Sequence, residues 1–196
     1  LVAAQNSGAP GKPKDEKTET TLPNKPDEKN NKQLTLSDVI VFPEVEDWQK
    51  GDEVKYPTPE LGYSVTYQST EGGRVTVYVY NAGLRKIPDG ANDKITQNEI
   101  ENVKNEIKQF GKAGIYQGLK EVKSDTVTLG GADGKVKALR TLFYFKARGE
   151  ELDSEVYLFG YKNNFIKICA TRPKTEGAQN AVFAGLLAEI DKMFAQ

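Results

Sequence analysis

Histidine is absent from the 196 residues of this chain, and cysteine and tryptophan occur once each, as Cys169 and Trp48. Histidine is the side chain that titrates near neutral pH, and it is the commonest metal ligand. Its absence removes the commonest routes to general acid–base catalysis, to a Ser-His-Asp triad and to zinc binding. The lone cysteine excludes an internal disulfide. The sequence therefore contains no residue set that is typical of an enzyme.

Strong charge of one sign and long apolar runs are also missing. The 27 lysines and arginines nearly balance the 28 aspartates and glutamates, which leaves a formal net charge of −1. No overall field draws the protein to a polyanion, so we expect no nucleic-acid partner. No apolar run approaches the ~18 residues that cross a bilayer, so we expect no membrane span. With 37% hydrophobic and 28% charged residues, the composition is typical of a globular domain.

The first residues bear on the location of the protein. Leu1–Gln5 resembles the end of a secretory signal, because Val2 and Ala4 occupy the small-residue positions before a cleavage site. From this pattern we expect a periplasmic or secreted protein. An arbitrary boundary of the sequence is the alternative explanation of the same residues.

Residues 1–33 are predicted to form a disordered tail. From Gln5 onward they contain almost no branched or aromatic side chain, so they cannot bury enough apolar surface to offset the entropy of ordering. Between Lys12 and Glu19 the charges alternate in sign, which favours a solvated tether over a nucleic-acid-binding arm. The tail is either a spacer or an ordinary unstructured terminus. Residues 34–196 are expected to form one domain.

Alternating polar and apolar residues predict a β-hairpin, which a helix follows. The period is two in 63–67 and 75–80. An apolar stripe with helical spacing then consists of Ile100, Val103, Ile107 and Phe110. Thr96 and Glu99 have the spacing of a capping box, so this helix is expected to begin at Thr96 and to end near 111–114.

Four more strands and a second helix complete the pattern. The strands are expected at 122–129, 136–147, 152–161 and 165–171, with short turns between them. An apolar stripe in 182–194 predicts a C-terminal helix that packs on the sheet. Residues 142–145 and 156–159 are apolar on both strand faces, so both faces need cover. The expected fold class is α+β, a mainly antiparallel sheet between helices in an α/β/α sandwich.

Two segments of this pattern carry a resemblance to a known family. Leu61–Tyr67 forms the first long strand, and Phe165–Ile168 precedes the final helix. With the order hairpin, helix, meander and helix over about 56–194, they resemble the PsbP-like fold. That family includes photosystem II extrinsic subunits, a Ran-binding nuclear import factor and uncharacterised bacterial envelope proteins, and Val77–Gly83 is similar to the last group. The resemblance implies a partner-binding protein and supplies no catalytic residue.

Two groups of polar side chains are candidates for binding a hard cation such as calcium, which prefers oxygen ligands. They are Glu150, Glu151, Asp153 and Glu155, expected around one turn, and Asp89, Asn92 and Asp93, in the loop before the first helix. Neither group has the spacing of an EF-hand. A solvated polar turn is the alternative at both places. We therefore assign no metal ligand and expect no cofactor.

The strand tyrosines, the cysteine and one glycine-rich segment each have two interpretations. Exposed rings form a platform for sugars or bases, but core packing is favoured for Tyr78, Tyr80, Tyr144, Tyr157 and Tyr161.

Cys169 shares a strand face with Phe165 and Lys167. The neighbouring lysine favours a reactive thiol, whereas burial favours a small hydrophobic core residue, which is the preferred interpretation. Residues 130–134 lack the ending of a phosphate loop and are expected to form a hairpin turn.

These observations predict a non-enzymatic, exported accessory domain that binds a protein or an envelope component. The expected binding surface is the Asn81–Lys94 loop or a sheet edge, with an exposed patch at the loop and no deep polar pocket. One alternative is a hydrolase or lyase with two carboxylates converging in a cleft, one of them with a raised pKa. Another is a small-molecule carrier with an apolar cavity between the sheet and the C-terminal helix.

Overall fold

The computed structural model describes residues 40–70, 72–174 and 179–195. The chain divides into two units, Leu1–Gln33 and Leu34–Gln196. The predicted disordered tail and the signal-like Leu1–Gln5 segment lie outside the described residues.

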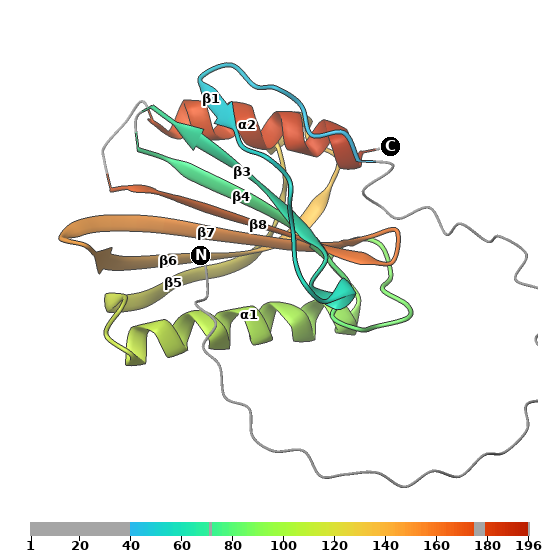
Figure 1. Cartoon of the computed structure of the whole chain (residues 1–196), viewed down its shortest axis with the longest axis horizontal. Coiled ribbons are helices and arrows are strands. Elements are labelled where there is room, and N and C mark those ends of the chain that lie inside the picture. The colour runs from blue at the N-terminus through green and yellow to red at the C-terminus, as the bar shows by residue number, and fades with distance from the viewer. Residues whose placement is uncertain (1–39, 71, 175–178, 196) are drawn as a thin grey trace, which may run out of the picture. The chain divides into compact units, whose positions relative to one another are not determined.

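A single antiparallel sheet of eight strands dominates the described part (Figure 1). Its strands are β1 (Trp48–Lys50), β2 (Val54–Lys55), β3 (Tyr63–Ser69), β4 (Arg74–Tyr80), β5 (Gln117–Thr128), β6 (Lys137–Ala147), β7 (Glu150–Tyr161) and β8 (Asn164–Pro173). The helices are α1 (Lys94–Lys112) and α2 (Gln179–Phe194), and two 3-10 turns are η2 (Pro59–Leu61) and η3 (Gly131–Asp133). The predicted α+β class with an antiparallel sheet is confirmed.

The strand order is β1-β3-β4-β8-β7-β6-β5, and β2 also pairs with β3. The predicted hairpin is β3–β4 and the predicted meander is β5 to β8. The meander joins the hairpin through β4 and β8, where Val77 pairs with Ile168. The helical segment therefore separates two strand units that form one continuous sheet.

Two clusters of buried side chains hold the helices on this sheet. In the first cluster, Leu186 and Ile190 of α2 are fully buried with Ile168 of β8. In the second, Ile100 and Val103 of α1 pack with the aromatic and aliphatic residues of β6, β7 and β8. Figure 1 shows α1 and α2 on opposite sides of the sheet. Each large apolar side chain that is fully buried contributes about 1.5–3 kcal/mol.

The start of α1 differs from the prediction. The helix begins at Lys94, and the carboxylate of Asp93 caps it by accepting a hydrogen bond from the Ile95 N–H at 2.8 Å. The predicted cap Thr96 is fully buried, and its hydroxyl has no hydrogen-bond partner among the described residues. Glu99 accepts a hydrogen bond from the Tyr80 hydroxyl at 2.7 Å. The predicted capping box is therefore wrong, because Asp93 caps the helix, Thr96 is buried within its first turn and Glu99 binds Tyr80.

Several strand limits also differ from the prediction. β5 begins at Gln117, five residues before the predicted start, and its pairing with β6 shifts register twice, before Lys120 and before Lys123. Such bulges break the period of two on which the prediction depended. β1 and β2 are too short to give a periodic signal. None of the helices in the described part is long and apolar enough to cross a membrane.

Candidate functional site

The loop between β4 and α1 is fixed to the sheet at its base. At one end, the N–H groups of Asn81 and Ala82 donate to the Glu60 carbonyl at 3.3 and 3.0 Å. At the other end, Gly90 and Gly160 exchange two backbone hydrogen bonds of 2.8 and 2.9 Å. A Cβ at Gly160 would lie within 1.9 Å of the loop backbone, so only glycine permits this approach.

The polar candidates of this loop hold its conformation. The carboxylate of Asp89 accepts the N–H of Lys162 at 2.7 Å, which ties the loop to the turn between β7 and β8. Asp93 caps α1 through the N–H of Ile95. Asn92 is exposed. Two of the three candidate side chains are therefore engaged with backbone donors.

The tip of the loop, Ala82–Lys86, is exposed throughout. A turn fixes it, because the N–H of Gly83 donates to the Asn81 side chain and the N–H of Leu84 donates to the Asn81 carbonyl, both at 2.9 Å. Ala82 and Gly83 have left-handed φ values of 51° and 75°. Leu84 is 42% exposed, and an arginine and a lysine follow it. The continuous exposed stretch of this loop is therefore Ala82–Lys86, five residues on a fixed base.

The carboxylates predicted around a turn lie along strand β7. Only Arg148 and Gly149 form the turn, both with positive φ. Glu155 is buried and accepts hydrogen bonds from the Tyr157 hydroxyl and, at 2.7 Å, from the Arg172 guanidinium. In the described part of the chain, no group of three or more histidine, cysteine, aspartate or glutamate residues is placed to hold a metal ion.

Two carboxylates near β5 have shifted pKa values, and both shifts are downward. Hydrogen bonds from Arg140, together with Lys123, lower the pKa of Asp125 to about 2. Partial burial acts to raise the pKa of Glu121, but hydrogen bonds from Lys104 and neighbouring donors outweigh it and lower this pKa to about 2. A carboxylate that acts as a general acid needs a raised pKa, which is the opposite direction.

A hollow of about 480 Å³ lies between α1 and strands β5 and β6, and Asp125, Arg140 and Lys104 are among the residues that line it. These charges are paired. Arg140 donates to both oxygens of Asp125 at 2.9 Å, and Lys104 contacts Glu121 at 2.7 Å. The charged side chains of Asp125, Arg140 and Lys104 in this hollow are therefore each neutralised by an ion pair.

Four of the five candidate platform tyrosines divide into two groups, and the fifth, Tyr144, is half-buried and donates to the Glu151 carboxylate at 2.5 Å. Tyr157 and Tyr161 are buried in the cluster that includes α2, as the core interpretation predicts. Tyr78 and Tyr80 are half-buried, and the ammonium of Lys167 lies 4.7 and 5.4 Å from their ring centroids. Burial is the main cause that raises the pKa values of Tyr78, Tyr80 and Tyr157. These hydroxyls therefore stay protonated.

Cys169 is half-buried beside the cluster that includes α1. Burial raises the pKa of its thiol and outweighs the ammonium of Lys167, which acts in the lowering direction. A raised pKa disfavours the thiolate, the reactive form. The structure thus favours the interpretation of Cys169 as a small hydrophobic residue.

The long edge strand β5 carries features that oppose pairing with another chain. Gly118 has a positive φ of 63°, and two register shifts interrupt the strand. Lys120 and Lys123 lie in the same irregular segment. Bulges and lysines are the usual protection of exposed sheet edges. Of the two surfaces expected for binding, the loop is therefore better suited than this edge.

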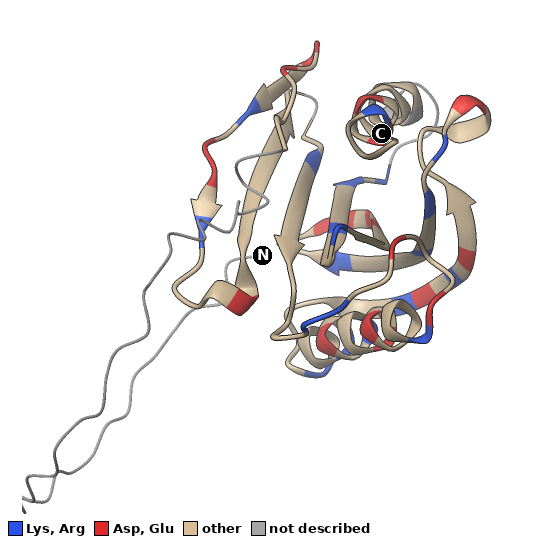
Figure 2. Cartoon of the chain, turned by 90° about the vertical axis from the view of Figure 1, so that its right-hand side faces the viewer, with Lys and Arg blue, Asp and Glu red and all other residues tan. Residues whose placement is uncertain are grey.

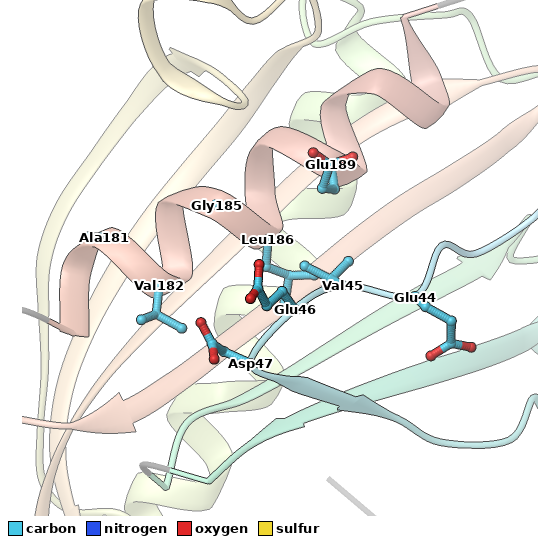
Figure 3. A pocket seen from close by; sticks show the side chains of 9 residues that line it. All are labelled: Glu44, Val45, Glu46, Asp47, Ala181, Val182, Gly185, Leu186 and Glu189. Carbon is cyan, nitrogen blue, oxygen red and sulfur yellow. The ribbon is translucent and has the colours of Figure 1, made fainter.

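The structure also contains a surface groove that the sequence did not indicate (Figure 3). It has a volume of about 530 Å³ and lies between the segment Glu44–Asp47 and α2. The residues that line it are Glu44, Val45, Glu46, Asp47, Ala181, Val182, Gly185, Leu186 and Glu189. The acidic run Glu44-Val45-Glu46-Asp47 is visible in the sequence. The contact of this run with α2, more than 130 residues later in the chain, depends on the tertiary fold and is not visible in the sequence.

Charges elsewhere on the domain are mixed. Figure 2 shows acidic and basic positions interspersed along α1 and over the strands. No protein-family model matches the chain, and a search of the curated proteins finds no match.

Proposed function

We propose that this chain is a non-enzymatic accessory protein whose α+β domain binds a partner protein through the loop tip Ala82–Lys86. The observation that carries the proposal is an exposed leucine followed by two cations on a base that backbone hydrogen bonds fix to the sheet. A preordered tip loses little conformational entropy on binding. The leucine supplies apolar contact area, and the cations select an acidic partner surface.

The chemistry of the domain supports binding more than catalysis. The shifted carboxylate pKa values, at Glu121 and Asp125, move downward because cations donate to them. Burial raises the pKa of the Cys169 thiol. A histidine-free enzyme would depend on a carboxylic acid with a raised pKa or on a thiolate with a lowered pKa. The pKa shifts of these residues go the opposite way.

Two further parts of the proposal concern fold family and location. The order of hairpin, helix, four-strand meander and helix supports a PsbP-like fold, as does the packing of α1 and α2 in separate core clusters. We propose on this basis a helix–sheet–helix sandwich of the bacterial envelope branch. A periplasmic or secreted location is supported by the signal-like residues Leu1–Gln5.

The test is capture of partners from an envelope extract with matched variants of the full chain. The loop variant replaces Leu84, Arg85 and Lys86 with serine. The control variant replaces Lys112, Ile115 and Lys120 with serine, which also removes one exposed aliphatic side chain and two exposed cations. We expect wild type and control to retain the same protein and the loop variant to lose it. Retention by the loop variant, or capture of no protein by wild type, contradicts the proposal.

A further inference from the structure

We infer that the groove between Glu44–Asp47 and α2 is a second docking surface, which takes a peptide segment bearing apolar side chains and lysine or arginine. This surface shares no residue with the loop tip Ala82–Lys86. Three features of the groove suit it to such a segment: an apolar floor, an acidic rim that is only partly compensated, and fixed walls.

The floor of the groove is apolar, and its accessible side chains are the half-buried Val45 and Val182, while Leu186, which also lines it, is fully buried. Val182 and Leu186 lie four residues apart on α2 and therefore on one face of the helix, where Val45 faces them across the groove (Figure 3). Gly185 lies between them in sequence, and a Cβ added there would meet nothing within 4 Å. The helix thus leaves room beside Gly185 for apolar atoms of a bound segment.

The rim is acidic, and part of its charge has no counterion. Four carboxylates and no cation line the groove. Glu44 pairs with Lys50 at 2.5 Å, and Glu189 pairs with Lys192 at 2.6 Å. Glu46 and Asp47 are exposed and make no ion pair with any described residue. A segment with lysine or arginine supplies the missing charge.

The walls of the groove are held together by Trp48. Its backbone N–H donates to the Val45 carbonyl at 3.1 Å, and its indole N–H donates to the Val182 carbonyl at 3.4 Å. Its ring packs edge to face against Phe183 of α2, with centroids 5.0 Å apart. Because one buried side chain contacts both walls, the groove exists before any partner binds, and binding does not need to order it.

The arrangement of the carboxylates favours a peptide over a metal ion. They lie along the rim, as Figure 3 shows for Glu44, Glu46, Asp47 and Glu189, and the described residues contain no cluster placed for a metal. Exposed ion pairs contribute little affinity each, because water and salt screen them. Burial of apolar side chains on the floor therefore supplies most of the affinity, and the rim selects a basic segment.

The probe is a fluorescein-labelled 14-residue peptide of leucine and lysine, compared with the same peptide carrying glutamate in place of lysine. Binding to the full chain is followed by fluorescence anisotropy. We expect the lysine peptide to bind and the glutamate peptide not to bind. The affinity should fall as salt rises, because the rim charges are exposed.

Three variants separate the contributions. Glu46→Gln with Asp47→Asn removes the two rim charges that have no counterion, and asparagine at position 47 tolerates the positive φ of 66°. We expect at least fivefold weaker binding. Gly185→Leu fills the floor without changing charge, and we expect a similar loss. Asp133→Asn with Glu150→Gln, at exposed positions away from the groove, should leave the affinity within twofold.

Two results overturn the inference. One is unchanged binding by the Gly185→Leu protein, which would show that the peptide does not enter the groove. The other is an equal loss in the Asp133→Asn, Glu150→Gln protein, which would show attraction to overall charge. The serine variant of the loop tip should bind the peptide like wild type, so this test is independent of the loop proposal. Circular dichroism of each variant checks that the fold is retained.

Discussion

The carboxylate of Asp191 on α2 accepts the backbone N–H of Val136 at 2.8 Å, in the connection between β5 and β6. The same carboxylate accepts the N–H of Lys135, with both oxygens at 3.0 Å. Asp191 is only 5% exposed. One side chain of the last helix therefore satisfies two backbone donors more than fifty residues earlier and fixes α2 to the meander.

Replacing Asp191 with alanine should destabilise the domain by about 2–4 kcal/mol, because two backbone donors lose their acceptor in a largely buried place. Asparagine should cost less, since it keeps one acceptor oxygen. Urea unfolding followed by the fluorescence of Trp48 measures both changes. Asp133→Ala, at an exposed position of η3, is the control and should shift the free energy of unfolding by less than about 0.5 kcal/mol. Equal values for the two alanine variants would contradict this role.

Gly160→Ala should displace the base of the binding loop without altering its exposed tip. The added Cβ would lie 1.9 Å from the Pro88 carbonyl oxygen, so the loop must move away from β7. We expect a loss of stability of about 1–3 kcal/mol, in the range of a forced overpacking. Partner capture should also weaken, although Leu84 and its neighbours are unchanged. Gly185→Ala, where a Cβ meets nothing within 4 Å and φ, as at Gly160, is not positive, is the control for an added methyl group.

Stability should fall in acid through Asp125 and Glu121. Their pKa values in the folded protein are lowered to about 2. A lowered folded pKa adds stability above the unfolded pKa near 4, and this stability is lost as the pH falls toward 2. Urea titrations between pH 6 and pH 2.5 should therefore show declining stability. The Glu121→Gln, Asp125→Asn protein should show a shallower decline, and an unchanged slope would contradict the assignment.

The thiol of Cys169 should react slowly in the folded protein. Burial raises its pKa, so little thiolate forms at pH 8. We expect the native chain to react with a chromogenic disulfide at least about tenfold more slowly than the chain in urea. A native rate equal to the unfolded rate would show that the thiol is accessible and would reopen a chemical role for this residue.

The sequence predicted the elements whose periodicity is strong and uninterrupted. The hairpin β3–β4 and the apolar stripe of α2 belong to this class, because alternation or helical spacing extends over each of them. The meander was predicted from apolar segments separated by short turns, and the bulges of β5 displaced its predicted start. The start of α1 was misplaced because Thr96 and Glu99 fit a capping box by spacing alone. Packing buries Thr96, and the Tyr80 hydroxyl binds Glu99. Neither fact is visible along the chain.

The surfaces were predicted less completely than the strands. The loop before α1 was identified from its turn residues, but its continuous exposed part is Ala82–Lys86, since contacts with Glu60 and Gly160 fix the base. The groove was missed because its two walls are distant in sequence and meet through Trp48. The carboxylates of 150–155 were misassigned to a turn, because the tight turn at Arg148 and Gly149 lets β7 begin two residues earlier.

The central claim is that the tip of the β4–α1 loop contacts a partner protein, and site-specific photo-cross-linking in cells tests it most directly. A photoreactive amino acid is placed at Leu84 in one strain and at Ile115 in another. Both are exposed aliphatic positions, 42% and 55% accessible. The account predicts a discrete cross-linked protein from position 84 and none from position 115. No cross-link at position 84, or the same product from both positions, would contradict it.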